Sequence, residues 1–200
     1  MKALNIQNKG TARQSGFTII ELVVVILLLG ILTATALPRF LDVTDEAHDA
    51  VIDATRAGLL TAGALYRAQW VAENQPNTDV GYGPTGNIDA STTGYPIGID
   101  DSLTLDSAAD CLAVYQGILQ TGRPLATAGT SSNPTVSGDI TGDAGYTAGT
   151  SDILAVFDTG AAGICSYYYV GQKTIGSAIE VIQYNSATGD VTEPASGLVH

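Results

Sequence analysis

One apolar run near the N-terminus limits the structures open to this chain more than any other feature. From Phe17 to Leu37 the sequence holds 21 residues and a single charge, Glu21. Because a helix rises about 1.5 Å per residue, the run is long enough to cross the hydrocarbon core of a bilayer. A carboxylate in that environment costs about 2.5 kcal/mol or more unless it is paired. The sequence therefore predicts a membrane-spanning helix in which Glu21 has a partner.

The residues before the run favour one orientation of this helix. Residues 1–16 contain three basic side chains, Lys2, Lys9 and Arg13, and no acid. Positive charges tend to stay on the cytoplasmic side, so we expect the N-terminus in the cytoplasm and the C-terminus in the periplasm. The simplest alternative is a plain single-pass anchor in which Glu21 reaches toward the cytoplasmic headgroups.

Two cleavage sites are compatible with the run. An ordinary signal peptide is cut after its apolar segment, and Ala34-Thr35-Ala36 offers the small residues for such a cut. A cut before the run, between Gly16 and Phe17, would instead leave the apolar helix in the product.

The second site resembles the processing signal of the type IV pilins and related pseudopilins, the class III signal of prepilins. The likeness is carried by Gly16, Phe17, Thr18, Glu21, Leu22, Gly30 and Pro38. In that family a prepilin peptidase cuts after the glycine of a Gly-Phe-Thr-x-x-Glu motif and methylates the new N-terminus. The resemblance implies a cleaved leader, residues 1–16, and a mature chain that begins with N-methyl-Phe17.

This processing suggests a partner for the lone acid. The new amine on Phe17 of one copy can neutralise Glu21 of a copy already in a helical bundle. Opposite charges about 4 Å apart attract by roughly 4 kcal/mol at an effective dielectric constant of 20. We therefore expect Phe17 and Glu21 to set the register of a homopolymer.

Charge and composition exclude several other functions. The chain carries 20 acidic and 8 basic residues, and with the three leader cations removed the net charge falls to about −15. Such acidity disfavours direct nucleic-acid binding and suits an exported surface. With two histidines and no glycine-rich phosphate loop, the sequence offers no catalytic constellation. We expect no enzymatic activity and no cofactor.

The helix should continue beyond the membrane, with a kink at Pro38, whose ring removes a backbone donor. Residues 17–38 would form the membrane or filament-core segment, and residues 39–75 an amphipathic continuation. Apolar or small residues recur in two stripes at helical spacing. One comprises Phe40, Ala47, Val51, Ala54, Gly58 and Leu65, and the other comprises Leu41, Ile52, Leu59 and Tyr66. Two stripes predict two partners: the chain's own globular domain and neighbouring helices.

Residues 76–200 are predicted to form a globular head. It would contain an irregular segment placed like the αβ-loop of pilins, a short helix from Ala108 to Leu119 capped by Asp106 or Ser107, and a small antiparallel sheet. Strand patterns occur at Ile153–Phe157, Cys165–Val170, Ala178–Tyr184 and around Val191. The predicted fold class is α+β: a long N-terminal helical spine packed on a small antiparallel sheet, the ladle fold of pilins.

Residues 126–151 are almost wholly small or polar, so we expect a surface excursion. Asp139, Thr141 and Asp143 alternate like the first ligands of a calcium loop, but Ala144 and Thr150 stand where that loop needs glycine and glutamate. They form a weak calcium candidate, and no other metal site is predicted.

The two cysteines, Cys111 and Cys165, both lie in the part expected to be exported. An even number of cysteines in an oxidising compartment favours a disulfide over free buried thiols. In type IV pilins a bridged pair bounds the C-terminal D-region, and residues 111–165 match that role.

The sequence as a whole is most similar to the MSHA-type (mannose-sensitive haemagglutinin) major pilins. The grounds are Pro38-Arg39-Phe40-Leu41, Asp45-Glu46-Ala47, Gly94-Tyr95-Pro96, and Cys165 at the start of a tyrosine-rich strand. This likeness implies an inner-membrane subunit that becomes part of an extracellular pilus for attachment, motility or DNA uptake. Its partners would be further copies of itself, the prepilin peptidase and the inner-membrane assembly platform. Host or surface glycans are candidate ligands, but a sugar ligand does not carry over from this likeness, because the polar insert at residues 126–151 is where adhesive specificity could differ.

Two other functions fit the same N-terminus. One is a type II secretion pseudopilin, although the major pseudopilin usually lacks such a cysteine pair. The other is a monomeric membrane-anchored surface binding protein.

Overall fold

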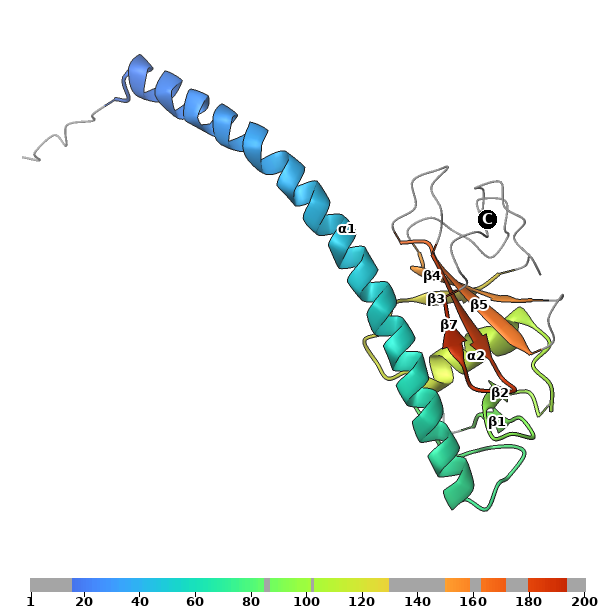
Figure 1. Cartoon of the computed structure of the whole chain (residues 1–200). Helices are drawn as coiled ribbons and strands as arrows, with labels where there is room; N and C mark the ends of the chain where they lie inside the picture. Colours follow the sequence, from blue (N-terminus) through green and yellow to red (C-terminus); the bar gives the residue numbers. More distant parts are fainter. Residues whose placement is uncertain are drawn as a thin grey trace, which may run out of the picture. The chain divides into compact units, whose positions relative to one another are not determined.

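A computed structural model describes residues 16–84, 87–101, 103–129, 150–158, 163–171 and 180–193. The chain divides into two compact units, Met1–Asp45 and Glu46–His200. Helix α1 (Ile19–Ala72) runs through the boundary between them without interruption (Figure 1). The remaining elements belong to the second unit, which is the head.

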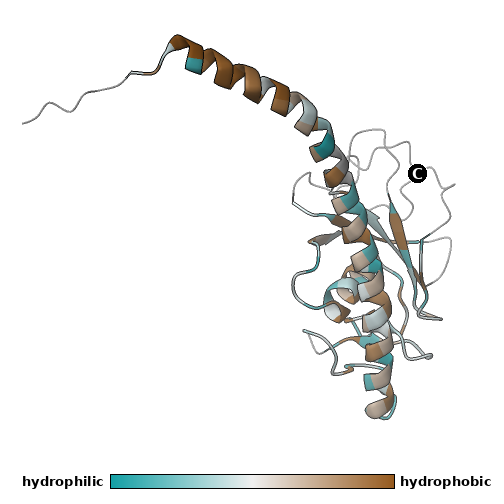
Figure 2. Ribbon diagram, turned by 60° about the vertical axis from the view of Figure 1, so that its left-hand side comes forward, coloured by the Kyte–Doolittle hydropathy of each residue, from teal (hydrophilic) through white to brown (hydrophobic). Residues whose placement is uncertain are grey.

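The first unit is dominated by the apolar half of α1. Residues Ile19–Phe40 form a stretch of 22 residues that is long and apolar enough to cross a membrane, and none of them is buried. Figure 2 shows this half coloured hydrophobic almost throughout. Pro38 lies inside the helix, which continues past it as predicted. The kink expected at this residue stays a prediction.

The second half of α1 buries a single stripe. Ile52, Leu59 and Tyr66 belong to the main hydrophobic core together with residues of the sheet. These three members of the predicted stripe face the head as expected, whereas the side chain of the fourth member, Leu41, lies outside the described part of the structure. The other predicted stripe is exposed or half-buried, with Leu65 on it 55% exposed.

The end of α1 at Ala72 is fixed by two residues in left-handed conformations. Asn74 and Gln75 have φ angles of 65° and 61°. The Gln75 amide donates to the carbonyl of Trp70 at 2.9 Å, which satisfies one of the last helical carbonyls. The predicted end near Asn74 is therefore confirmed, and Pro76 follows just beyond it.

The main sheet of the head has five strands in the order β3-β4-β5-β6-β7. Their bounds are β3 Ala126–Ala128, β4 Ile153–Phe157, β5 Ile164–Tyr169, β6 Val181–Asn185 and β7 Val191–Thr192. Strands β4 to β7 are antiparallel neighbours, as predicted. A small separate hairpin pairs β1 (Asp89–Ala90) with β2 (Pro96–Gly98).

The tyrosines of strand β5 pack on both faces of the sheet. Alternate residues face opposite sides: Tyr167 and Tyr169 join the main core, whereas Tyr168 joins a smaller cluster that includes Leu154 and Val170. The hydroxyl of Tyr167 donates to the carbonyl of Cys111 at 2.9 Å, so this buried polar group is satisfied.

Helix α2 (Ala108–Ile118) forms where predicted. Ser107 caps it through a capping box, in which the Ser107 side chain accepts from the Asp110 amide and the Asp110 carboxylate accepts from the Ser107 amide. Cys111 in α2 and Cys165 in β5 form the predicted disulfide, which ties the helix to the sheet.

The expected start of the surface excursion at residue 126 was wrong. Residues 126–128, assigned to a surface excursion, form edge strand β3, which pairs with β4 in parallel. Small residues suffice there because backbone hydrogen bonds, not side chains, hold an edge strand. The residues of the weak calcium candidate, Asp139, Thr141 and Asp143, lie outside the described residues.

Candidate processing and assembly site

The predicted processing site lies just before the start of α1. Gly16, Phe17 and Thr18 are not helical, and Ile19 is the first helical residue. Phe17 is 89% exposed. The Gly16–Phe17 peptide bond is thus in irregular backbone, where a peptidase can bind an extended substrate more readily than in a helix.

The lone acid is held by a neighbour in its own helical turn. The carboxylate oxygen Oε2 of Glu21 accepts from the Thr18 amide at 3.0 Å and from the Thr18 hydroxyl at 2.8 Å. In return the Thr18 hydroxyl oxygen accepts from the Glu21 amide at 3.3 Å. These bonds form a capping box, the Thr-x-x-Glu motif that satisfies free amides at a helix start. The spacing of Thr18 and Glu21 carries this signal, although the sequence led us to expect only a partner from another copy.

Polar side chains further along the apolar half are also satisfied within the helix. The hydroxyls of Thr33 and Thr35 donate to backbone carbonyls three and four residues earlier, at 2.9 to 3.3 Å. A hydroxyl bonded in this way can face hydrocarbon at little cost. The charges of this stretch are few: Glu21 is the one acid in Ile19–Phe40, and Arg39 is the one base.

Pro38 lies 17 residues from Glu21 in the same helix. The structure brings Phe17 and Glu21 into the same turn region, but it does not bring Pro38 near them. Any joint role of these three residues would need several copies of the chain.

A groove runs beside the second half of α1. Its volume is about 940 Å³. One wall is formed by α1 residues that include Val51, Ala54, Gly58 and Leu65, which are members of the predicted outward stripe. The opposite wall is the loop from Leu119 to Pro124 together with Tyr169. The stripe that the chain's own core leaves uncovered is thus one side of a groove.

The charged groups of this groove already have partners. Arg123 donates to the carbonyls of Leu119 and Gln120 at the end of α2, at 3.1 and 3.2 Å. The Asp152 carboxylate accepts from the Leu125 amide at 3.1 Å. The groove therefore presents a mainly apolar surface without a free charge from these two residues.

His48 contacts one of the residues that line this groove. It is half-buried, and its Nδ1 lies 2.7 Å from the hydroxyl of Tyr169 on β5. This contact links α1 to the sheet. The sequence does not show this contact, because nothing local indicates that β5 passes beside this turn of the helix.

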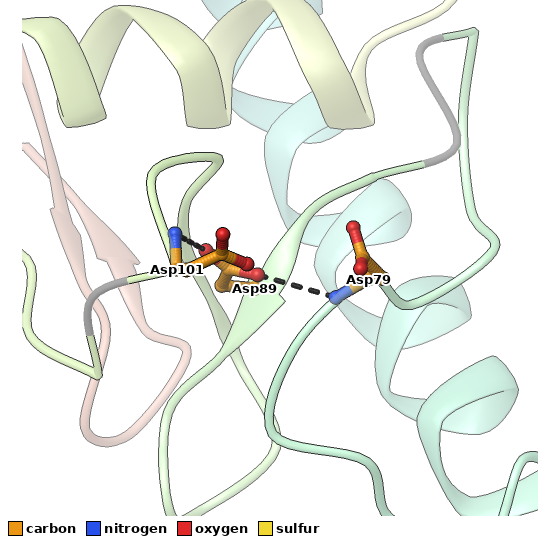
Figure 3. A group of neighbouring side chains, drawn as sticks. All are labelled: Asp79, Asp89 and Asp101. Carbon is orange, nitrogen blue, oxygen red and sulfur yellow. Dashed lines mark hydrogen bonds between the residues drawn. The ribbon is translucent and has the colours of Figure 1, made fainter.

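Three acids gather in the segment between α1 and α2, with Asp89 on strand β1. One carboxylate oxygen each of Asp79, Asp89 and Asp101 lies within 4.8 Å of the others (Figure 3). Asp89 is only 1% exposed, and its carboxylate accepts from the amides of Asp79 at 3.2 Å and Asp101 at 2.8 Å. Burial, reinforced by the two neighbouring acids, raises the pKa of Asp89 above its usual range.

This arrangement is explained by the fold of the segment between α1 and α2. Asp79 and Asp101 have positive φ angles of 56° and 60°, and Asp89 ties both turns together through their amides. The sequence gives no sign of the cluster, because the three acids are ten or more positions apart and follow no ligand spacing.

Taken together, these features define a class of protein: an α+β head carried on a long helix whose first half is exposed, apolar and marked by one acid in its first turn. Residues 11–37 match the model of a family described as the prokaryotic N-terminal methylation motif. The chain is 37% identical over 106 residues to the type IV narrow pilus major component PilA5 of Thermus thermophilus, an alignment that covers 52% of this chain and 90% of that protein. No solved structure matches the chain.

The chain belongs to the type IV pilins. It is thus a structural pilus subunit related to a major pilin, and its N-terminus carries the methylation motif of prepilins.

Proposed function

We propose that this pilin is cut between Gly16 and Phe17 by a prepilin peptidase, is methylated on Phe17, and then polymerises into an extracellular filament that attaches cells to surfaces. The observation that carries the proposal is the contrast in burial along α1. Apolar side chains from Ile19 to Phe40 have no cover within the described part of the chain. Such an apolar surface must be kept from water. Before assembly the membrane covers it, and after assembly other copies of the chain cover it.

The head offers a complementary surface for those copies. Each chain brings one uncovered apolar helix and one apolar groove beside Val51, Ala54 and Leu65. A contact between two different surfaces of identical subunits is heterologous, and when its rotation does not close it generates an open helical polymer. This supports a filament in preference to a closed dimer.

In this proposal Glu21 selects the register. The methylated amine of Phe17 on an incoming copy pairs with Glu21 of a neighbour. This pairing neutralises two charges that would otherwise stand alone in an apolar environment. Pro38 allows the helix to bend where it leaves the apolar bundle. Residues 1–16 keep the amine blocked, so polymerisation waits for cleavage.

The finer assignments rest on sequence likeness. The resemblance to MSHA-type pilins supports an inner-membrane precursor with a cytoplasmic N-terminus and a periplasmic head. It also supports assembly by an inner-membrane platform. The net acidity of the chain speaks against direct contact with nucleic acid, and the proposed role requires no catalysis or cofactor.

The test is to express the full chain with a pilus assembly system and to compare Glu21→Val, Leu65→Glu and Leu103→Glu with the parent. Mass spectrometry of the mature product should find N-methyl-Phe17 at the N-terminus. Electron microscopy should find abundant fibres for the parent and far fewer for Glu21→Val, although both chains insert into the membrane.

Leu65 and Leu103 are a matched pair, 55% and 53% exposed, but only Leu65 lines the groove. We expect Leu65→Glu to reduce fibres strongly and Leu103→Glu to leave them near the parental level. A product that begins near Leu37, or single molecules that never associate, would contradict the proposal. Short fibres confined to the periplasm would indicate a pseudopilin instead.

A further inference from the structure

The apolar half of α1 has its one base at its far end. Arg39 is the only arginine or lysine between Arg13 and Arg56, and it is exposed near the end of the stretch Ile19–Phe40. Among the described residues, its side chain makes no hydrogen bond or ion pair. A guanidinium has five N–H donors and a full charge, so it needs an acceptor wherever lipid excludes water.

The position of Arg39 matches the edge of a bilayer. Glu21 precedes it by 18 positions in the same helix, which is about 27 Å at 1.5 Å per residue. The hydrocarbon core of a bilayer is about 30 Å thick. The two charges therefore stand at opposite ends of an uncharged stretch that fits this core, and each can reach headgroups when the helix spans the membrane.

The neighbours of Arg39 indicate the same boundary. Pro38 lies inside the helix, and its ring removes the amide that would bond to the carbonyl of Ala34. A carbonyl without a donor is costly in hydrocarbon, but headgroup water can satisfy it. Asp42 and Asp45 are the first acids after Glu21, and carboxylates stay in water. Hydrocarbon should therefore end close to Arg39.

We propose that Arg39 binds the phosphate group of a phospholipid in the leaflet farther from the N-terminus, and that this contact sets the depth of α1 in the membrane. The inference rests on the proposed membrane-spanning precursor. A guanidinium fits phosphate oxygens in a bidentate geometry, and its aliphatic stem can lie along the helix while the charge reaches the headgroups. The occupant is a lipid because the helix before Arg39 is exposed and apolar throughout (Figure 2).

The contact itself can be measured by solid-state NMR. The full chain, labelled with 13C in arginine, is placed in vesicles of phosphatidylethanolamine and phosphatidylglycerol that are free of inorganic phosphate. Dephasing of the arginine Cζ signal by lipid 31P reports a guanidinium in contact with a phosphate. The difference between the parent and Arg39→Gln isolates Arg39, since both chains share the other arginines. We expect a dephased component that Arg39→Gln loses.

A second sample separates lipid from free phosphate. The same chain in maltoside detergent micelles, with inorganic phosphate and no lipid, should give no such component. A component of equal size in these micelles would mean that Arg39 binds soluble phosphate, and the assignment to lipid would be wrong.

The depth of the helix can be measured with a spin label attached through Val43→Cys. Val43 is 60% exposed and lies one turn beyond Arg39, and the two native cysteines are bridged. In this background Arg39→Gln should move the label about 3 Å deeper, two residues of helical rise, because the apolar stretch then loses its charged end. Arg39→Lys should keep the parental depth, since an ammonium also binds phosphate. Thr35→Val is the matched control and should change nothing, because the Thr35 hydroxyl bonds only to carbonyls of its own helix.

Parental depth or a parental NMR signal in Arg39→Gln would overturn the inference. An equal shift of the label in Asp42→Asn would assign the effect to a pair within the helix. Failure of the proposed precursor would look different. A spin label attached through Leu29→Cys, near the middle of the stretch, would then be open to an aqueous nickel complex in the parent itself.

Discussion

The two halves of α1 belong to one continuous helix but solve the problem of apolar surface in different ways. In Ile19–Phe40 apolar residues cover all sides, and none is buried. In the segment from Ile52 to Trp70 they form a stripe that is buried in the head. A helix that is apolar all round must be covered by lipid or by other helices, whereas a stripe needs only one partner. The comparison shows that the chain covers the apolar side chains of α1 with its own residues only in the second half.

The largest expected effect comes from one substitution made in each half. Leu59 is fully buried and Leu27 is 61% exposed. Leu59→Ala should lower the free energy of unfolding of the head by about 3 kcal/mol, because it removes core contacts and leaves a cavity. Leu27→Ala should change it by less than about 0.5 kcal/mol.

The measurement is denaturant unfolding of the full chain in detergent micelles, followed by the fluorescence of Trp70. This residue is the single tryptophan of the sequence, and it lies in the core with its N–H donating to the carbonyl of Pro76 at 2.8 Å. Equal losses in the two variants would mean that the halves of α1 do not differ as described.

Much of this contrast could be predicted from the sequence, because it depends on local patterns. The extent of the apolar run, the inward stripe at Ile52, Leu59 and Tyr66, and a cap of α2 at Asp106 or Ser107 all follow from spacing and residue type. These signals involve residues within a few turns of one another. The cysteine pair was also predictable, since two cysteines in an oxidising compartment allow only one bridge.

The parts that escaped prediction depend mostly on contacts between distant residues. Edge strand β3 consists of Ala126, Thr127 and Ala128, which have no strand pattern of their own and pair only because β4 lies beside them. The carboxylate of Asp89 finds its donors 10 and 12 residues away. His48 meets Tyr169 across 121 positions. At the candidate site, Thr18 belongs to the family motif, but its hydrogen bonds to Glu21 emerged only from the structure.

Two glycines, one in contact with the core of the head and one in the apolar half of α1, offer a second comparison of stability. The expected change in the free energy of unfolding is of intermediate size. Gly94 has a φ angle of 84°, and an added Cβ would lie 2.3 Å from the Trp70 ring. Gly94→Ala should destabilise the head by about 2 kcal/mol through strain and overpacking. Gly30 is helical with no neighbouring atom within 4 Å, so Gly30→Ala should leave the head unchanged and stabilise the apolar helix by up to about 1 kcal/mol.

The fluorescence of Trp70 follows the unfolding of the head in both variants, and circular dichroism in micelles follows the helical content. Loss of head stability in Gly30→Ala would indicate that residues of the apolar half contact the head. A fully tolerated Gly94→Ala would mean that the loop can move away from Trp70 at no cost.

The smallest expected effect is on the pH dependence of head stability, and it concerns acidic residues. The apolar half of α1 has one acid, Glu21, whereas the second half has several. Partial desolvation of this exposed residue, and then the charges of Asp49, Glu193 and Asp53, raise the pKa of Glu180. A raised carboxyl pKa means that the folded head holds this proton at a pH where the unfolded chain has lost it. The contribution of Glu180 to stability is therefore greatest below its usual pKa of about 4.5 and is lost as pH rises through the raised value.

Glu180→Gln removes this titration, so the variant should gain stability over the parent as the pH increases from 4 to 7. Because solvent screens much of the repulsion, we expect a gain in melting temperature of only about 1 to 2 °C at pH 7 and almost none at pH 4. Thr192→Ser, a neutral change on neighbouring β7, serves as the control and should follow the parental pH profile. A gain that is the same at both pH values would mean that packing, and not the charge of Glu180 facing the acids of α1, distinguishes the variant.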